Sequence, residues 1–166
     1  MLLQARNAIE KSNHVNLILD VDGVLTDGKF SYTSEGKQSK VFGSHDSDAL
    51  RMVSSQAQIS LVSADHRGFK ISESRSRDMG IEIKLLDPKE RLDFVLQKKL
   101  TGFTIFVGDS FTDIPALKAS DFSIAPANAL TVVKRSVSLV LKNKGSDGAV
   151  YELCAKLFKK RFEDLT

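Results

Sequence analysis

Cysteine is almost absent from this chain of 166 residues, which contains only Cys154. A single thiol cannot form a disulfide within the chain, and no residues nearby could complete a thiolate metal site. Cys154 lies in an apolar stretch, so we expect a buried thiol, which is compatible with a reducing compartment.

Long apolar runs and a strong excess of one charge are also missing. No run approaches the roughly 20 residues that a membrane-spanning helix needs, and the first residues lack the basic start and apolar core of a secretory signal. We therefore expect a cytoplasmic protein with no membrane partner. The 24 basic and 21 acidic residues leave a net charge of only +3. Nucleic acid binding needs basic residues gathered into a stripe, so we expect no such partner.

Neither a repeat nor a low-complexity linker divides the chain, so residues 1–166 are expected to form a single domain. Short apolar strands alternate with helices, a pattern that predicts βαβ units and a three-layer, Rossmann-like α/β fold with a parallel sheet. Residues 29–42 differ, because turn residues separate two extended segments and predict a β-hairpin. Besides a short helix at the start, we expect strands at 15–19, 59–63, 81–85, 104–107, 122–125 and 138–141, and helices at 46–56, 68–79, 88–100, 114–118, 130–135 and 148–162.

Polar side chains follow three of the predicted strands. Asp20 and Asp22 end the first strand, Ser63 ends the second, and Asp109 and Asp113 follow a later one. The carboxyl ends of parallel strands share one edge of the sheet, where such folds bind ligands. Clustered carboxylates repel one another unless a cation lies among them. A few oxygen ligands, with room for water and a phosphate, favour Mg²⁺.

This constellation suits phosphoryl transfer to a carboxylate. An aspartate can attack phosphorus and divide one difficult step into two, while a second carboxylate protonates the leaving oxygen and later activates water. Asp22 is suitably placed for the second task, because it lies two residues after Asp20 and Gly23 permits a tight turn. Ser63 can donate to a phosphate oxygen, and Lys89 can offset charge on the phosphoryl group.

The same residues carry a family resemblance. Asp20–Gly28, read as DVDGVLTDG, resembles motif I of haloacid-dehalogenase phosphatases. Ser63 resembles motif II, Lys89 motif III, and residues 108–113, read as GDSFTD, motif IV. Their order and spacing match across nearly the whole chain. The long motif I and the hairpin after it resemble the capless subgroup that contains 3-deoxy-D-manno-octulosonate 8-phosphate phosphatase, and also the phosphatase-like domain of some acylneuraminate cytidylyltransferases.

The resemblance implies a role for each motif. Asp20 would be the nucleophile and a metal ligand. Asp22 would be the acid/base catalyst and would also bind Mg²⁺ through its backbone carbonyl. Asp109 would complete the protein ligands with Asp113 in support, while the motif II and motif III residues would hold the transferring phosphoryl group.

The resemblance also implies a substrate. Arg51, Arg67 and Arg75 lie where the subgroup carries substrate-contacting arginines, and we group Ser110 with them. A guanidinium binds either a carboxylate or a phosphate bidentately. The expected activity is therefore Mg²⁺-dependent hydrolysis of a small phosphorylated sugar acid, similar to 3-deoxy-D-manno-octulosonate 8-phosphate or a nonulosonate 9-phosphate, in lipopolysaccharide or sialic acid biosynthesis.

Three segments depart from the subgroup pattern. Residues 44–47 read SHDS where the subgroup has VRDG, and Ala64-Asp65 replaces the Gly-Arg that usually follows the motif II hydroxyl. Residues 145–149 read GSDGA instead of GGRGA, which removes an arginine that relatives can lend to a neighbouring subunit. These changes leave the core chemistry intact and alter substrate recognition.

No cap domain is expected, because a hairpin and one helix fill the interval between Asp22 and Ser63. Phosphoryl transfer benefits from the exclusion of water, so another element should cover the site. The resemblance implies a homotetramer in which neighbouring subunits complete each site. A hairpin that carries Phe30, Tyr32, Val41 and Phe42 would otherwise leave apolar surface and strand edges uncovered.

Two other functions are open. The altered recognition segments would suit a non-catalytic oligomerisation or regulatory module associated with sugar-nucleotide synthesis, although such a module gains nothing from the packing of like charges. The pair of acidic residues after the first strand would also suit a receiver-type phosphoacceptor domain, with Asp65 as the phosphorylated residue. The hairpin and the GDSFTD run fit the receiver type poorly.

Overall fold

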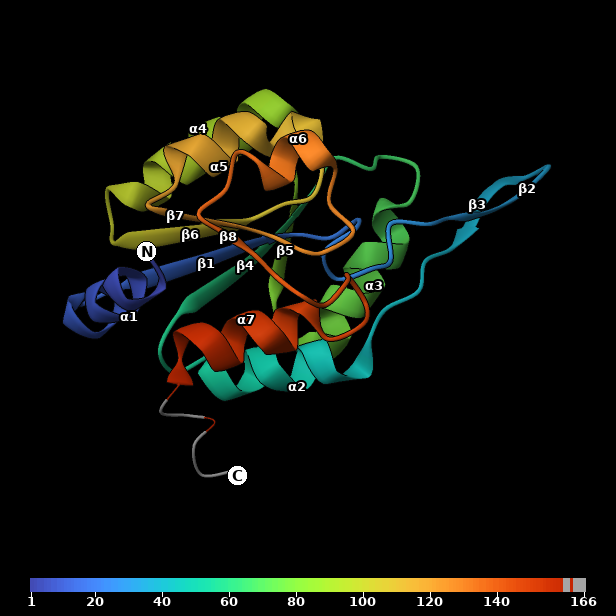
Figure 1. Ribbon diagram of the computed structural model, residues 1–166. Coiled ribbons are helices and arrows are strands. Elements are labelled where there is room, and N and C mark those ends of the chain that lie inside the picture. Colours follow the sequence, from blue (N-terminus) through green and yellow to red (C-terminus); the bar gives the residue numbers. More distant parts are fainter. Residues whose placement is uncertain (160–161, 163–166) are drawn as a thin grey trace.

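The computed structural model describes residues 1–159 and residue 162. A central sheet of six parallel strands runs in the order β5-β4-β1-β6-β7-β8 (Figure 1). The predicted three-layer α/β fold is confirmed. The strands are β1 (Val15–Asp20), β4 (Gln58–Ser63), β5 (Glu82–Leu85), β6 (Phe103–Val107), β7 (Phe122–Ala125) and β8 (Leu139–Val140).

Helices cover both faces of the sheet (Figure 1). Leu17 and Leu19 of β1 belong to the apolar core under α1, α2, α3 and α7, whereas Ile18 packs toward α4, α5 and α6. All six residues of β1 are buried, which explains why this strand reads as a nearly continuous apolar run. The helices are α1 (Leu2–Lys11), α2 (Ser44–Val53), α3 (Phe69–Met79), α4 (Pro88–Lys99), α5 (Ile114–Ala119), α6 (Thr131–Lys134) and α7 (Ala149–Leu157), with a 3₁₀ turn η1 (Phe111–Asp113) before α5.

Local signals set most of the helix ends. Asp87 and Glu90 form a reciprocal capping box at the start of α4, and Gly80 closes α3 in the left-handed conformation at φ 66°. The helix predicted for 46–56 is observed as α2, which ends earlier because the amides of residues 56 and 57 both turn back to the Val53 carbonyl. The helix predicted for 148–162 is observed only as α7, and residues 160 and 161 lie outside the described part. Among the described residues, none of the helices combines the length and the apolar character that spanning a bilayer requires.

A separate antiparallel hairpin, β2 (Ser31–Thr33) and β3 (Gly36–Ser39), extends away from the body of the molecule (Figure 1). An isolated bridge between Thr26 and Phe42 closes its base. Phe30, Tyr32 and Val41 are 41%, 55% and 60% exposed. In the described chain only this hairpin and α2 lie between β1 and β4, so no cap domain covers the carboxyl edge of the sheet.

Candidate active site

The carboxyl ends of three neighbouring strands form the site. β1 pairs with β4 on one side and with β6 on the other. The chain passes from β1 to β4 and β5, and then crosses to β6 on the far side of β1. Ligands of such folds bind at this reversal of strand order. Asp20 is the last residue of β1, Ser63 is the last of β4, and Asp109 follows the end of β6, so the sheet brings these three groups to one place.

An acidic cluster occupies this edge. Asp20, Asp109 and Asp113 each present a carboxylate oxygen, and these oxygens lie within 4.8 Å of one another. The close approach depends on Gly23, which has φ +97° and on which a Cβ would lie only 2.0 Å from Asp109 Oδ2. Only glycine therefore fits at this position of motif I.

The negative charges of the cluster favour the binding of a cation. Burial raises the pKa of Asp20 well above its ordinary value, and the charge of Asp113 adds to this effect while Arg91 opposes it. Burial and the charge of Asp113 likewise raise the pKa of Asp109 to about 7. Burial and the neighbouring negative charge thus both oppose the ionised forms of Asp20 and Asp109, and a bound cation would favour the ionised forms.

Asp113 is already committed to other partners. Its Oδ2 accepts hydrogen bonds from the amides of Asp109 at 3.1 Å and Ser110 at 3.0 Å, and its Oδ1 pairs with Arg91. Asp20 and Asp109 therefore remain as the carboxylates that could hold an ion. Hard oxygen donors of this kind suit a divalent cation such as Mg²⁺, so the residues present fit the predicted metal site.

The cation beside Asp20 is Arg91, whereas the sequence analysis assigned this place to Lys89. The Arg91 side chain is only 3% exposed, and its NH2 lies 3.1 Å from Asp20 Oδ1 while its NH1 contacts Asp113. Lys89 is exposed, and its described contact is a backbone hydrogen bond to the Asp87 cap. The difference follows from helix geometry, because two residues along an α-helix turn the side chain by about 200°. Arg91 and Val95, one turn apart, are the buried positions of α4. This spacing was the sequence signal that could have identified Arg91 as a buried residue.

The predicted acid/base residue is held from two directions. Asp22 Oδ2 accepts a hydrogen bond from Ser63 Oγ at 3.0 Å, and Asp22 Oδ1 lies 2.7 Å from Lys40 Nζ. Ser63 is fully buried and also accepts a hydrogen bond from the Asp65 amide at 3.1 Å. In this structure the Ser63 hydroxyl thus donates its hydrogen bond to Asp22. The hydroxyl would have to rotate to donate to a phosphate oxygen.

Sequence reasoning missed Lys40, which forms a buried network with Asp65. Lys40 Nζ lies 2.9 Å from Asp65 Oδ2, and Lys37 Nζ lies 2.5 Å from the same oxygen. Partial burial opposes ionisation of Asp65, but the two lysines and the Gly68 amide outweigh it and lower the pKa of Asp65 to about 2. A lysine next to a hairpin strand gave no chemical signal, because only the tertiary structure places the base of the hairpin beside Asp22 and Asp65. Asp65, the residue of the receiver-type alternative, is bound to these lysines and is not part of the acidic cluster.

The acidic cluster opens into a cavity of about 390 Å³. Ser110 lines this cavity, whereas Arg51, Arg67 and Arg75 do not. Arg51 is 76% exposed and lies 3.9 Å from Asp48 on α2; Arg67 is exposed before α3, and Arg75 is half-buried on α3. The structure therefore does not bring the three predicted arginines to the site of their own chain. The cavity lining is Asp20, Asp22, Gly28, Phe30, Lys37, Ala64, Asp65, Arg91, Asp109, Ser110 and Thr112.

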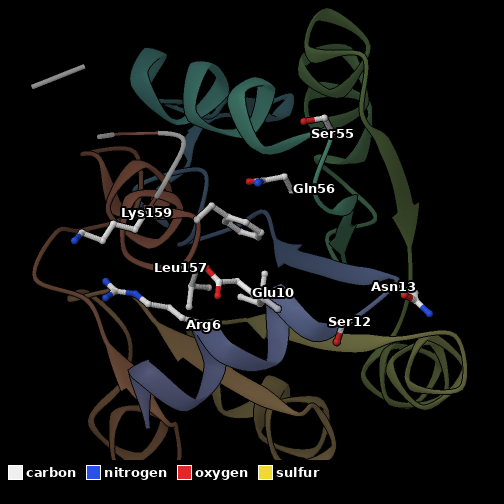
Figure 2. Close-up of a pocket in the computed structure, with 10 residues that line it drawn as sticks. Arg6, Glu10, Ser12, Asn13, Ser55, Gln56, Leu157 and Lys159 are labelled. Atoms are coloured by element: carbon white, nitrogen blue, oxygen red, sulfur yellow. The ribbon is translucent and has the colours of Figure 1, made fainter. Parts of the chain in front are cut away.

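A larger hollow of about 600 Å³ lies at the opposite end of the sheet, between α1 and the ends of α2 and α7 (Figure 2). Arg6, Glu10 and Gln56 are among its lining residues. Among the described residues that line this hollow, Glu10 is the one carboxylate, so these residues do not provide the convergent acidic groups that a metal ion requires. The smaller cavity at the carboxyl edge is therefore the better candidate for the active site.

Comparisons with known proteins identify the family to which this chain belongs. No profile of a known protein family matches the chain. The 3-deoxy-D-manno-octulosonate 8-phosphate phosphatase KdsC of Haemophilus influenzae is 34% identical over 142 residues, which cover 82% of this chain and 78% of the relative. A cobalt-bound structure of the H. influenzae phosphatase has a TM-score of 0.77 at 31% identity and covers 90% of both chains.

A further structure extends the likeness in fold. The phosphatase of Moraxella catarrhalis, in complex with magnesium, phosphate and KDO, has a TM-score of 0.83 at 24% identity and covers 99% of this chain and 97% of its own. The identity and coverage of the H. influenzae relative are high enough to establish family membership. With its acidic cluster at the carboxyl edge of a capless α/β sheet, this chain belongs to the 3-deoxy-D-manno-octulosonate 8-phosphate phosphatase family.

Proposed function

We propose that this chain, as a single domain with a hairpin insertion, is a Mg²⁺-dependent phosphatase whose substrate is a small phosphorylated sugar acid, with 3-deoxy-D-manno-octulosonate 8-phosphate as the first candidate. The observation that carries the proposal is the buried Asp20 carboxylate at the end of β1. It lies beside Arg91 and within reach of the Asp109 and Asp113 carboxylates. The activity of the H. influenzae relative supports the choice of substrate.

Two steps complete the reaction. In the first, an Asp20 oxygen attacks phosphorus, the bond from phosphorus to the leaving oxygen breaks, and Asp22 gives its proton to that oxygen. In the second, Asp22 takes a proton from water, the water oxygen attacks phosphorus, and the bond to Asp20 breaks to release phosphate. The products are an alcohol and inorganic phosphate, and both aspartates return to their starting state.

Charge compensation comes from the residues around Asp20. Arg91, which the sequence analysis overlooked, would bind phosphoryl oxygens through its planar guanidinium as negative charge shifts in the transition state. Asp20, Asp109 and the backbone carbonyl of Asp22 would hold Mg²⁺, which supplies further neutralisation of the phosphoryl oxygens when bound. Ser63 would orient Asp22 and, after rotation, the phosphoryl group.

We also propose a cytoplasmic homotetramer. The three arginines assigned to the substrate lie away from the cavity of their own chain, so one chain leaves the sugar-binding part of the site incomplete. The exposed hairpin residues Phe30, Tyr32 and Val41 offer apolar surface that a second copy could cover. Light scattering that finds only monomers at micromolar concentration would contradict this assembly.

A non-catalytic module remains the competing function, because Asp65 replaces the arginine of the subgroup and neutralises two lysines beside the cavity. Turnover separates the two functions. The purified chain with Mg²⁺ is assayed against p-nitrophenyl phosphate, 3-deoxy-D-manno-octulosonate 8-phosphate and nonulosonate 9-phosphates. Asp20→Asn should abolish phosphate release while the exposed control Asp93→Asn retains it. No release from any ester, or full activity of Asp20→Asn, would contradict the enzyme proposal.

A further inference from the structure

The ammonium group of Lys40 is completely buried beside the active site, and its partners come from three separate segments. Its Nζ lies 2.7 Å from Asp22 Oδ1 and 2.9 Å from Asp65 Oδ2, and it donates a hydrogen bond to Ser72 Oγ at 2.8 Å. Asp22 belongs to the loop after β1, Asp65 follows β4, and Ser72 lies on α3. The contacts with the two carboxylates are ion pairs, and the contact with Ser72 is a hydrogen bond, so the buried charge of Lys40 is compensated on two sides.

We propose that Lys40 is a positioning residue for Asp22, which it orients for proton transfer to the leaving oxygen; this inference rests on the proposed phosphatase function. Lys40 does not line the cavity, so it acts through Asp22 and does not contact the substrate. Lys40 holds Oδ1 of Asp22 and Ser63 holds Oδ2. The carboxylate therefore cannot rotate without losing one partner. Each oxygen keeps a second lone pair, which can carry the transferred proton.

The position of Lys40 connects the hairpin to this proton transfer. Lys40 follows the last residue of β3 directly, and Asp65 links it to Lys37, whose Nζ lies 3.4 Å from the centre of the Phe30 ring. The cation–π contact and the shared carboxylate keep the base of the hairpin against the site. The hairpin thus contributes a buried group that orients the catalytic acid, in addition to any contact it makes with a second chain.

A purely structural role for Lys40 predicts a different result from a positioning role. If Lys40 only balances the charges of Asp22 and Asp65, its loss should impair every substrate equally. If it orients Asp22, its loss should impair esters whose leaving oxygen must be protonated and should spare esters whose leaving group departs as a stable anion. An alkyl phosphate belongs to the first kind, and p-nitrophenyl phosphate belongs to the second.

The experiment compares Lys40→Met with the wild-type chain in Mg²⁺. It measures kcat/KM, which covers the steps through departure of the leaving group, for 3-deoxy-D-manno-octulosonate 8-phosphate and for p-nitrophenyl phosphate. We expect the value for the sugar phosphate to fall roughly 10²-fold, the usual effect of losing acid catalysis, and the value for the aryl ester to fall much less. With p-nitrophenyl phosphate, whose first step is spared, acid quenching should also trap more phosphorylated Asp20 in the variant, because Asp22 activates water in the second step. The exposed lysine of α3 provides a control, and Lys70→Met should leave both values unchanged.

Equal losses for both esters, or no loss, would overturn the inference. Both values come from one preparation, so a partly unfolded sample lowers them by the same factor and cannot produce the selective loss. If Lys40→Met does not fold, Ser72→Ala decides the question, because it removes one partner of Lys40 and should produce a smaller selective loss of the same kind. A nonulosonate 9-phosphate replaces the sugar phosphate if the wild-type chain prefers it. A wild-type chain that hydrolyses none of the three esters would reject the phosphatase function, and the inference would fall with it.

Discussion

The Arg91→Met substitution tests the arrangement of the acidic cluster most directly. It removes a guanidinium that is 3% exposed and leaves Asp20 and Asp113 buried without their partner. Breaking a buried ion pair by removing one partner costs about 3–5 kcal/mol, against a total stability of about 5–15 kcal/mol for a domain. Asp20 and Asp109 can take up protons, which limits the loss. We therefore expect the free energy of unfolding to fall by about 3 kcal/mol at pH 7 and by less at pH 5.

Urea denaturation followed by circular dichroism, in EDTA and again in Mg²⁺, measures this change. The control is Lys89→Met, which alters an exposed side chain of the same helix and should change stability by less than about 0.5 kcal/mol. Arg91→Met should also lower kcat/KM for phosphate esters roughly 10²–10³-fold, whereas Lys89→Met should not. The reasoning would be refuted if Arg91→Met cost less than about 1 kcal/mol in EDTA, or if Lys89→Met caused the greater loss of activity.

Three further predictions concern titratable groups. Burial raises the pKa of Asp109 to about 7. Without metal, between about pH 4 and 7 the folded state therefore binds a proton that the unfolded state does not, and the free energy of unfolding falls as the pH rises through this range. Protons and Mg²⁺ compete for this carboxylate, so Mg²⁺ should raise Tm more at pH 8 than at pH 5, and equal shifts would contradict the assignment. The pKa of Asp65 is lowered to about 2, so the ionised carboxylate contributes fully to stability above about pH 4, and this contribution is lost as the pH falls toward 2. In Asp65→Asn the free energy of unfolding should therefore depend less on pH across that range. Burial raises the pKa of the Cys154 thiol, so Ellman's reagent should react with it only after denaturant is added, and rapid labelling of the folded chain would count against the structure.

The sequence by itself determined the fold class and the location of the site. Apolar runs of strand length alternate with helical segments, and three of the parallel strands are followed by polar residues at their carboxyl ends. The positions of Asp20, Ser63 and Asp109 therefore followed from the pattern. Helix starts and stops were also local properties, because a cap such as Asp87 or a left-handed glycine such as Gly80 acts within a single turn.

Only the tertiary structure decided which cationic side chains pair with the carboxylates of the site. Lys89 and Arg91 lie two positions apart on α4, and the packing of that helix against the sheet selects which of them faces Asp20. Lys40 reaches Asp22 and Asp65 because the base of the hairpin lies against the site, and the three arginines predicted to bind substrate do not line the cavity of their own chain. The direction of a side chain depends on how its helix or strand is rotated against the neighbouring elements. Two residues two positions apart on a helix differ in direction by about 200°, so they point to nearly opposite sides. The sequence of one segment does not specify how that segment is rotated against its neighbours.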